Sequence, residues 1–283
     1  MIKINNLTFG SDPEYFVINE KTGMILSSIN LVNGTKEIPE PLGDGFFILK
    51  DNILVEGNLP PASTKEGFME NVFGLKKRIL EYLKAINPSL GLLHKDCADV
   101  DMAFLSHPEA MQFGCSPYLN AWDKQVHRAN DLSSESYRTA GMHIHIGYDL
   151  EDGNLWSRET INNVITKAFD FFVVIPSCMI HVDKRRFENY GGLGQYRETS
   201  YGLECRSLGA FFANPEYSKW VIDQTVKAIE FITDDRKFYK LEYMKKPETR
   251  FIGGKFIFDS SVYEYLGINF NEQVVEINKF VHA

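Results

Sequence analysis

Polar side chains recur two positions apart in four stretches of this chain that are otherwise apolar and strand-like. With that spacing, both side chains of a pair point to the same face of a β-strand. The four pairs are Asp12 and Glu14, Glu56 and Asn58, His143 and His145, and Glu204 and Arg206. If these strands share one sheet, one face collects carboxylates, imidazoles and an arginine where Val, Ile and Leu are usual.

A strand face with several acids needs a positive charge to neutralise it. Side chains two positions apart on a strand lie about 6–7 Å from each other. Two carboxylates at that distance repel each other by about 2.5 kcal/mol at an effective dielectric constant of about 20. A hard divalent cation would relieve this repulsion, and oxygen-rich sites suit Mg²⁺, with Mn²⁺ as the alternative. The pattern therefore predicts a cation site.

The composition is that of a globular protein with a sizeable core. Of the 283 residues, 44% are hydrophobic, and 21 Phe and 13 Tyr argue against disorder. The net charge is −8 and basic runs are short, which argues against a dedicated nucleic-acid-binding protein. We expect a single domain over residues 1–283, with a core over about 1–235 and a C-terminal appendage over 236–283.

The sequence predicts a cytoplasmic protein without membrane contacts. The N-terminus has no apolar signal-peptide core. The longest apolar run, residues 169–180, is interrupted by Asp170 and Pro176 and is too short to span a bilayer. No CxxC pair occurs, so we expect reduced thiols. The four cysteines are Cys97, Cys115, Cys178 and Cys205.

Strand and helix signals alternate irregularly, and hairpins outnumber crossover connections. We expect strands over about residues 2–18, 24–29, 46–49, 53–58, 98–105, 138–148 and 201–212. We expect helices over about residues 63–86 (with Ser63 and Glu66 as a capping box), 157–172 continuing toward 180, 214–233, and from 271 onward. This order favours an α+β fold with a mainly antiparallel sheet and helices on one face.

His143-Ile144-His145-Ile146 is the most specific of the four pairs. Alternation places both imidazoles on one face and both isoleucines in the core. Two imidazoles on one strand face favour a metal or phosphate role, with hydrogen-bonded structural histidines as the alternative. One of them would bind a metal while the other orients the substrate.

The remaining pairs also have plainer explanations. Asp12 and Glu14 flank a proline, which is typical of a turn, and Glu56 fits a solvated edge strand. Arg206 lies in an otherwise uncharged strand and needs a carboxylate or phosphate partner. A local ion pair with Glu204 is the alternative, but the spacing disfavours a direct bidentate contact. We therefore expect both side chains to face a shared site.

A glycine-rich segment, residues 190–196, is flanked by Arg185, Arg186 and Arg197. Glycines let a loop close over a ligand and arginines bind phosphate, whereas a solvated basic loop is the alternative, above all for Arg185. The segment is neither a P-loop nor a dinucleotide fingerprint, because the Lys-Ser/Thr pair and the strand–turn–helix context are missing. A nucleophilic role for Cys115 is disfavoured, because no base is identifiable.

The order of these motifs resembles that of the phage-type carboxylate–amine ligases (amidoligases, type 2), within the glutamine synthetase and glutamate–cysteine ligase superfamily. The motifs are Gly-Ser-Asp-Pro-Glu (10–14), Glu-Gly-Asn-Leu-Pro (56–60), Gly-Cys-Ser-Pro (114–117), Arg-Thr-Ala-Gly-Met-His-Ile-His-Ile-Gly (138–147), Tyr-Arg (196–197) and Gly-Leu-Glu-Cys-Arg (202–206). The resemblance covers about residues 8–212. Met142 departs from the family pattern, where a second glycine is expected.

The resemblance implies a glutamine-synthetase-like catalytic domain, in which the concave face of a curved sheet binds ATP and Mg²⁺. It implies an ATP-dependent ligase that forms an amide bond: a carboxylate takes the γ-phosphoryl group, and an amine then attacks the acyl phosphate. The metal ligands implied are Asp12, Glu14, Glu56, His143 and Glu204. The nucleotide contacts implied are His145, Arg197 and Arg206, and the catalytic arginines are Arg186, Arg197 and Arg206.

The expected partners are a carboxylate and an amine, each a small molecule or a peptide, with no nucleic acid and no membrane. The oligomeric state stays open, and the expected location is the cytoplasm of a phage-infected bacterial host. One alternative is a zinc-dependent hydrolase that uses the His-x-His strand without ATP, although the other five histidines show no ligand-like spacing. The other alternative is a non-enzymatic phage protein that retains the fold.

Overall fold

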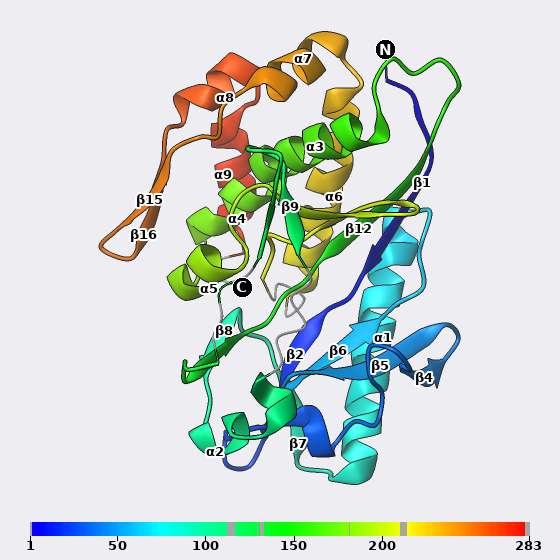
Figure 1. Ribbon diagram of the computed structural model, residues 1–283, viewed down its shortest axis with the longest axis vertical. Helices are drawn as coiled ribbons and strands as arrows, with labels where there is room; N and C mark the ends of the chain where they lie inside the picture. Colours follow the sequence, from blue (N-terminus) through cyan, green and yellow to red (C-terminus); the bar gives the residue numbers. More distant parts are fainter. Residues whose placement is uncertain are drawn as a thin grey trace.

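The computed structural model describes residues 2–111, 117–128, 130, 133–180, 182–209 and 214–280. It has an α+β fold in which every strand pair of the described residues is antiparallel (Figure 1). The strands form two main sheets rather than the single sheet that the sequence predicted. Two small ladders lie outside these sheets: β8 (Cys97–Asp99) with β11 (Tyr137–Thr139), and β15 (Thr249–Ile252) with β16 (Lys255–Phe258).

The first sheet runs in the order β1-β12-β14-β13-β9-β10. Its strands are β1 (Ile4–Ser11), β12 (Ile144–Leu150), β14 (Gly202–Cys205), β13 (Gln195–Thr199), β9 (Tyr118–Asn120) and β10 (Gln125–His127). The second sheet runs in the order β3-β2-β6-β5-β4, and β7 also pairs with β2. Its strands are β3 (Ile25–Leu26), β2 (Glu14–Asn19), β6 (Leu54–Asn58), β5 (Phe46–Asp51), β4 (Glu40–Gly43) and β7 (Leu90–Leu93).

The two sheets are joined by the N-terminal chain. β1 ends at Ser11 and β2 begins at Glu14, so only Asp12 and Pro13 separate a strand of one sheet from a strand of the other. Proline has no backbone N–H to donate to a ladder, which suits the point where pairing changes from one sheet to the other. The acids at positions 12 and 14 therefore lie where the two sheets meet.

Helices cover both sheets. α1 (Lys65–Ile86) buries Leu75 beside Gly57 of β6 in the second sheet and Phe68 against Phe9 of β1. Its N-cap is Thr64, not Ser63 as predicted, because the Thr64 hydroxyl accepts from the N–H of Gly67. The helices near the first sheet are α3 (Arg158–Phe169), a π-helical turn (Asp170–Val174), α4 (Ile175–Ile180), α5 (Lys184–Asn189) and α6 (Pro215–Ile232). The remaining helices are α2 (Met102–Leu105), α7 (Asp235–Tyr243), α8 (Ser261–Leu266) and α9 (Phe270–Asn278).

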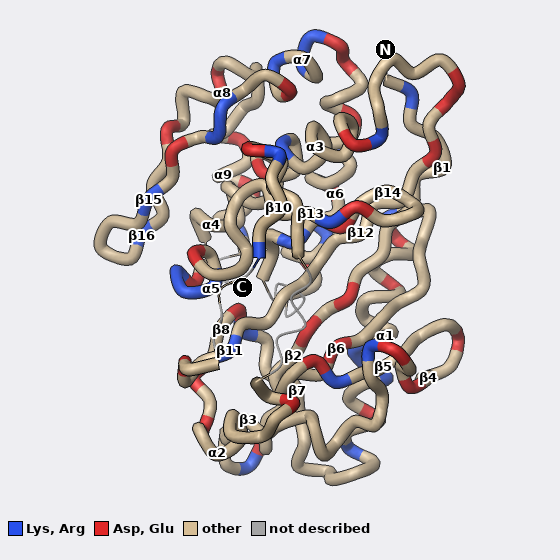
Figure 2. Tube along the Cα trace, viewed as in Figure 1, with Lys and Arg blue, Asp and Glu red and all other residues tan. Residues whose placement is uncertain are grey.

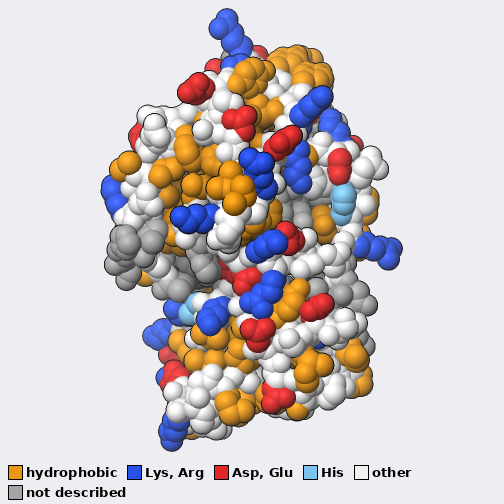
Figure 3. Space-filling model, turned by 90° about the vertical axis from the view of Figure 1, so that its left-hand side faces the viewer, with side chains coloured by type: hydrophobic (Ala, Val, Ile, Leu, Met, Phe, Trp, Pro, Cys, Tyr) orange, Lys and Arg blue, Asp and Glu red, His pale blue; other side chains and the backbone are white. Residues whose placement is uncertain are grey.

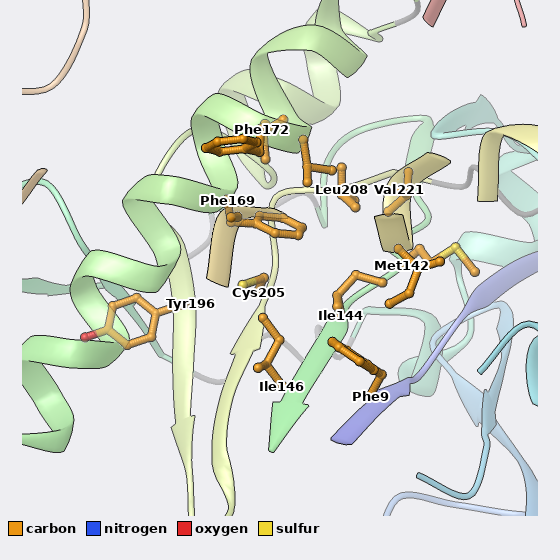
Figure 4. Close-up of a cluster of buried hydrophobic side chains, with 14 of the residues drawn as sticks. Phe9, Met142, Ile144, Ile146, Phe169, Phe172, Tyr196, Cys205, Leu208 and Val221 are labelled. Atoms are coloured by element: carbon orange, nitrogen blue, oxygen red, sulfur yellow. The ribbon is translucent and has the colours of Figure 1, made fainter. Parts of the chain in front are cut away.

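The first sheet presents an apolar face to α3 and α6. Ile144 and Ile146 on β12 are fully buried beside Phe169 of α3, as the alternation of that strand predicted (Figure 4). Each such side chain contributes about 1.5–3 kcal/mol by leaving water. Met142, where the family pattern has glycine, is also buried in this cluster, and its backbone N–H donates to Leu208. Its side chain therefore points away from the polar face.

The C-terminal segment packs into the same core. Phe238 and Leu241 of α7, Tyr263 of α8 and Ile277 of α9 belong to the hydrophobic cluster that contains Phe169. Lys167 of α3 is also buried, and its ammonium donates to the carbonyl groups of Leu241 and Glu242 at the end of α7. Described residues of the segment predicted as an appendage, 236–283, thus contribute side chains to the common core. The hairpin of β15 (Thr249–Ile252) and β16 (Lys255–Phe258) projects at the side (Figure 1).

Several predicted elements differ in length or type. The strand expected over 98–105 is a short strand, β8 (Cys97–Asp99), followed by α2, because Asp101 caps a helix through the N–H of Ala103. The strand expected over 138–148 divides into β11 (Tyr137–Thr139) and β12, and the strand expected over 201–212 ends at Cys205. Helices α7 and α8 were not predicted.

One continuous helical stretch, Arg158–Ile180, is long and apolar enough to cross a membrane by length and composition. It is 23 residues long and begins before the apolar run of residues 169–180, from which a segment too short to span a bilayer was predicted. Most of it is buried, since 89% of its most apolar window lies inside the protein. It is therefore the central core helix of this fold.

Candidate active site

A cavity of about 360 Å³ opens where the two sheets meet. It is lined by Asp12, Glu14, Glu56, Asn58, His143, His145, Arg197 and Arg206, together with Lys36, Asp51, Arg138 and Tyr190. The four polar pairs therefore converge from both sheets, as predicted, even though they do not share one sheet. Charged residues of both signs lie along the strands at this junction (Figure 2). In the space-filling view, acidic and basic side chains also gather on the surface between the upper and lower parts of the molecule (Figure 3).

The first sheet places a row of functional side chains on one face. In register, Gly10 pairs with His145, His145 with Glu204, and Glu204 with Arg197, across four neighbouring strands. Glu204 is completely buried. One of its oxygens accepts from Arg197 Nε at 2.8 Å and also from Arg197 Nη2, and its other oxygen accepts from Arg206 Nη1. The local ion pair that was the alternative explanation of Glu204 and Arg206 thus exists, inside the shared site.

Both histidines face Asp12 in the cavity. Nδ1 of His143 lies 3.0 Å from Asp12 Oδ1 and 3.2 Å from Glu204 Oε1, and Nε2 of His145 lies 3.3 Å from Asp12 Oδ1. Burial disfavours ionised Asp12, but the two imidazoles outweigh this effect and hold its pKa well below the usual range. Burial likewise opposes protonation of His145, but Asp12 and Glu204 raise its pKa.

Tyr190 is a site residue that the sequence did not predict. It is buried, and its hydroxyl lies 2.9 Å from Nε2 of His143 and accepts from Nη2 of Arg206. Because a guanidinium only donates, the hydroxyl can give its own proton to His143. The residue lies in the glycine-rich segment 190–196, and its type and position there carry no local signal of a site residue. Tyr190 thus connects one polar pair, at His143, with another, at Arg206.

The second sheet contributes a purely acidic group. Glu14 on β2 lies directly opposite Glu56 on β6, and Asp51 on β5 shares the face of Glu56 in the β5–β6 hairpin. One oxygen of each carboxylate lies within 4.8 Å of the others. Like charges directly opposite each other destabilise a sheet. Burial together with the neighbouring carboxylates raises the pKa of Glu56 well above its usual value, and burial raises that of Glu14.

Asp51 and Lys36 complete this group. The Lys36 ammonium donates to Asp51 Oδ2 at 2.9 Å. Burial lowers the pKa of Lys36, but Asp51, Glu56 and Glu14 outweigh it and raise the pKa. The sequence predicted that Asp51 lies in a turn over residues 50–52. In the structure Asp51 is the last residue of β5, because it pairs with Leu54, and the turn begins at Asn52, which adopts a positive φ of 58°. Correct placement of that turn would have put Asp51 on the face of Glu56.

Arg186 does not face the cavity, which corrects its predicted catalytic role. Its buried guanidinium donates to the carbonyl groups of Ala140 at 2.9 Å, Ser207 at 3.0 Å, and Leu208. It therefore holds the chain before His143 against the chain after Arg206. Gly191 of the glycine-rich segment serves this arrangement, because a Cβ at this position, where φ is +130°, would collide with the guanidinium of Arg186. Closure of the segment over a ligand stays a prediction.

Gly141 permits a second close approach. Its N–H donates to Glu14 Oε2 at 2.6 Å, and a Cβ at this position would lie 2.9 Å from Nε2 of His143. The glycine of the histidine motif thus brings a carboxylate of the second sheet against the backbone of the first.

Other predicted residues have plainer places. Arg185 forms surface ion pairs with Asp183 and Asp99, which agrees with the alternative prediction of a solvated basic residue. Cys115 lies outside the described residues. The other three cysteines are buried free thiols.

The residues present fit a hard divalent cation. Asp12 Oδ1, His143 Nδ1 and His145 Nε2 are buried and have no well-directed hydrogen-bond partner among the described residues. Asp12, His145 and Glu204 form one group whose ligand atoms lie within 4.8 Å of one another, and Glu14, Asp51 and Glu56 form the other. Five carboxylates and one imidazole suit Mg²⁺ or Mn²⁺. His145 belongs to the first group, and Nδ1 of His143 lies equally near, 3.0 Å from Asp12 and 3.2 Å from Glu204, so the metal-binding role of His143 stays a prediction.

Comparisons with known proteins agree with the resemblance. Residues 126–250, somewhat less than half of the chain, match the family model described as phage phiEco32-like COOH-NH2 ligase type 2. The expected resemblance to phage-type carboxylate–amine ligases is thereby confirmed. The matched segment contains both histidines, Glu204, Arg197 and Arg206. It leaves out the acids that β1, β2 and the β5–β6 hairpin bring to the cavity.

No curated protein matches the chain. Among solved structures, a bifunctional glutathione synthetase from Pasteurella multocida is similar, with 11% sequence identity and a TM-score of 0.45. The similarity covers 97% of this chain and 46% of that protein. The chain thus spans less than half the length of that protein.

Proposed function

We propose that this protein is an ATP- and Mg²⁺-dependent carboxylate–amine ligase that forms an amide bond through an acyl phosphate. The observation that carries the proposal is one cavity in which Arg197 and Arg206 lie beside two groups of cation-binding side chains. The match of residues 126–250 to the COOH-NH2 ligase family supports it independently of this geometry. The substrates are a carboxylate and an amine, each a small molecule or a peptide.

The chemistry of phosphoryl transfer explains why the cavity has this composition. Such transfer requires little covalent work from protein groups and depends on positioning and charge neutralisation. Asp12, His145 and Glu204, and separately Glu14, Asp51 and Glu56, would hold the cations, which supply positive charge to the phosphate oxygens.

The arginines act from the first sheet. Arg206 is buried, and one of its guanidinium nitrogens, Nε, has no hydrogen-bond partner among the described residues. Contacts with Glu204 and Tyr190 fix the other two nitrogens. A guanidinium held in this way is available to a phosphoryl oxygen without having to reorganise. Arg197, which is more exposed, would contact the same group from the next strand.

The zinc hydrolase remains the rival proposal, because Asp12, His145 and Glu204 could also accept zinc. The same cavity also holds Glu14, Asp51 and Glu56, however, and a group made only of carboxylates suits Mg²⁺ better than zinc. His94, His107 and His127 do not line the cavity. The oxygen-rich inventory therefore favours the ligase.

The test is hydroxamate formation. The purified protein with ATP, Mg²⁺, hydroxylamine and a panel of carboxylates (amino acids and short peptides) should release ADP and form a hydroxamate with at least one carboxylate. Omitting Mg²⁺ or the carboxylate should stop ADP release. Stoichiometric bound zinc together with ATP-independent hydrolysis would favour the hydrolase instead.

A pair of matched variants sharpens this test. Arg206→Ala removes the arginine held in the site, whereas Arg185→Ala removes one that forms surface ion pairs with Asp183 and Asp99. We expect Arg206→Ala to lose about 100-fold or more in kcat, as for other groups that stabilise transition-state charge, and Arg185→Ala to stay active. Equal activity of the two variants would remove Arg206 from the mechanism.

A further inference from the structure

A second hollow continues the polar face of the first sheet beyond the cavity where the two sheets meet (the junction cavity). Its volume is about 500 Å³, and its lining includes Tyr118 and Asn120 of β9 and Gln195 of β13. Gln195 lies directly opposite Asn120, and Arg197, two residues later on β13, lines the junction cavity. Residues two apart on a strand share a face, so both hollows lie on one face of one sheet. We call the second hollow the side cleft.

A pair of tyrosines lies between the side cleft and the junction cavity. The ring of Tyr118, which lines the side cleft, contacts the ring of Tyr190 edge-on, with 6.5 Å between the ring centroids. The hydroxyl of Tyr190 contacts His143 and Arg206 inside the junction cavity. An elongated ligand that occupies both hollows would therefore pass beside this tyrosine pair.

The side cleft carries two cations without an ion-pair partner among the described residues. They are Lys246 and Arg250, and both are exposed. Each acid of the cleft is already paired with a basic neighbour: Asp123 with His127 at 2.8 Å, and Glu188 with Lys184 at 3.5 Å. The charge that would complete the cleft is therefore negative.

The segment that supplies these two cations is basic over its whole length. Residues 236–258 contain seven Lys and Arg residues and two Glu, a net charge of +5 in a chain whose net charge is −8. Basic residues lie along β15 and β16 in particular (Figure 2). Charge complementarity steers a partner toward the matching surface and suppresses binding elsewhere. The charge of this chain thus attracts anions to the side of the molecule where the cleft opens.

We propose that the side cleft binds an acidic peptide, and that this peptide is the carboxylate substrate, whose reacting carboxyl group extends past Tyr118 into the junction cavity. The inference rests on the proposed function for the reaction of that carboxyl group, and it names the class of substrate. A nucleic acid is disfavoured, because Asp123 and Glu188 would repel its continuous phosphate backbone. A peptide can place its acidic side chains at Lys246 and Arg250 and avoid both acids.

The experiment measures binding of fluorescein-labelled hexaglutamate by fluorescence anisotropy, without ATP or Mg²⁺. The wild type should bind hexaglutamate at least about tenfold more tightly than labelled hexaglutamine. Lys246→Glu/Arg250→Glu turns two attractive pairs into repulsive ones, so it should bind hexaglutamate about tenfold more weakly. If charge reversal impairs folding, Lys246→Gln/Arg250→Gln replaces it, with an expected loss of about threefold.

The matched control is Lys245→Glu/Lys255→Glu. It changes the net charge by the same amount within the same basic segment, at exposed positions that do not line the side cleft. Its affinity for hexaglutamate should stay within about threefold of the wild type, because salt at about 0.15 M screens charges beyond about 8 Å. Thermal unfolding curves show which double variants fold. A folded control that loses as much affinity as the cleft variant would overturn the inference.

Two other binding results would also overturn the inference. One is equal affinity for hexaglutamate and hexaglutamine. The other is tighter binding of a single-stranded oligothymidine that Lys246→Glu/Arg250→Glu also weakens, which would assign the cleft to nucleic acid.

The hydroxamate assay connects the cleft with the reaction. Hexaglutamate should react with a KM at least about tenfold below that of glutamate, and Lys246→Glu/Arg250→Glu should raise this KM more than it lowers kcat. Reaction of amino acids without reaction of bound hexaglutamate would overturn the inference while the ligase proposal stands. If hexaglutamate binds as expected but no carboxylate gives ADP, the ligase proposal fails, and the acidic-peptide site stands without its role in substrate binding.

Discussion

Replacing Asp170 by asparagine should change how the stability of this protein depends on pH. Asp170 begins the π-helical turn between α3 and α4 and is completely buried. Its Oδ2 accepts from the indole N–H of Trp122 at 2.7 Å, whereas Oδ1 has no hydrogen-bond partner among the described residues. Burial raises the pKa of this carboxyl from 3.8 to about 7, although the Trp122 N–H opposes the shift.

The direction of the pH dependence of the unfolding free energy follows from which state binds the Asp170 proton. Between the unfolded pKa of 3.8 and the folded pKa of about 7, the folded state holds the Asp170 proton and the unfolded state does not. The contribution of Asp170 to the unfolding free energy is therefore fully present below about pH 4 and is lost as the pH rises through about 7. A difference of about three pKa units corresponds to about 4 kcal/mol, of which about 2–3 kcal/mol is lost between pH 5 and pH 8.

Asp170→Asn should remove this loss. The amide oxygen can still accept from Trp122, but the new amide N–H group has no partner, which costs about 1–3 kcal/mol at every pH. We therefore expect the variant to be nearly as stable as the wild type at about pH 5 and to be more stable by about 1–3 kcal/mol at about pH 8.

Urea unfolding at several pH values, read from midpoints at equal slope, measures this difference. Asp149→Asn, at an exposed position on β12, controls for the loss of one negative charge. A variant that is destabilised equally at all pH values would refute the reasoning, because it would mean that Asp170 is ionised and paired in the folded protein.

Two further variants test how the site is held together. Gly141→Ala places a Cβ 2.9 Å from Nε2 of His143, so we expect kcat/KM to fall about tenfold or more, with a loss of about 1–3 kcal/mol in stability; unaltered kinetics would show that the close approach is not needed. Tyr190→Phe removes the hydroxyl between His143 and Arg206, so we expect kcat to fall while the melting temperature changes little; a fall in substrate affinity alone would assign Tyr190 to binding.

Local pattern was enough to predict much of the fold. The alternation around His143 and His145 correctly separated the polar face from the core, because burial of Ile144 and Ile146 leaves one register for that strand. The helix signals of α1 and α6 were equally reliable, since each combines helical periodicity with a polar N-cap. Convergence of the four polar pairs was also correct.

What the sequence did not reveal depends on contacts between distant segments. The division into two sheets follows from the change of pairing at Pro13, which has no local signal beyond the proline itself. The sequence around Arg186 is typical of a phosphate-binding arginine, and only its four backbone carbonyl acceptors identify it as structural. Tyr190 and Lys36 gain their importance from partners far away in the chain. Their types and spacing alone gave no indication of this.

The crossing of the N-terminal chain from one sheet to the other makes the protein indivisible. β1 supplies an edge strand to the sheet that carries His145, while β2, two residues later, supplies an inner strand to the sheet that carries Glu56. A fragment containing only the later part of the chain would lack both an edge strand and the carboxylates that Asp12, Glu14 and Glu56 bring to the cavity. A chain cut between β1 and β2, or an exchange of one part for that of another protein, would therefore disrupt the fold and the site together.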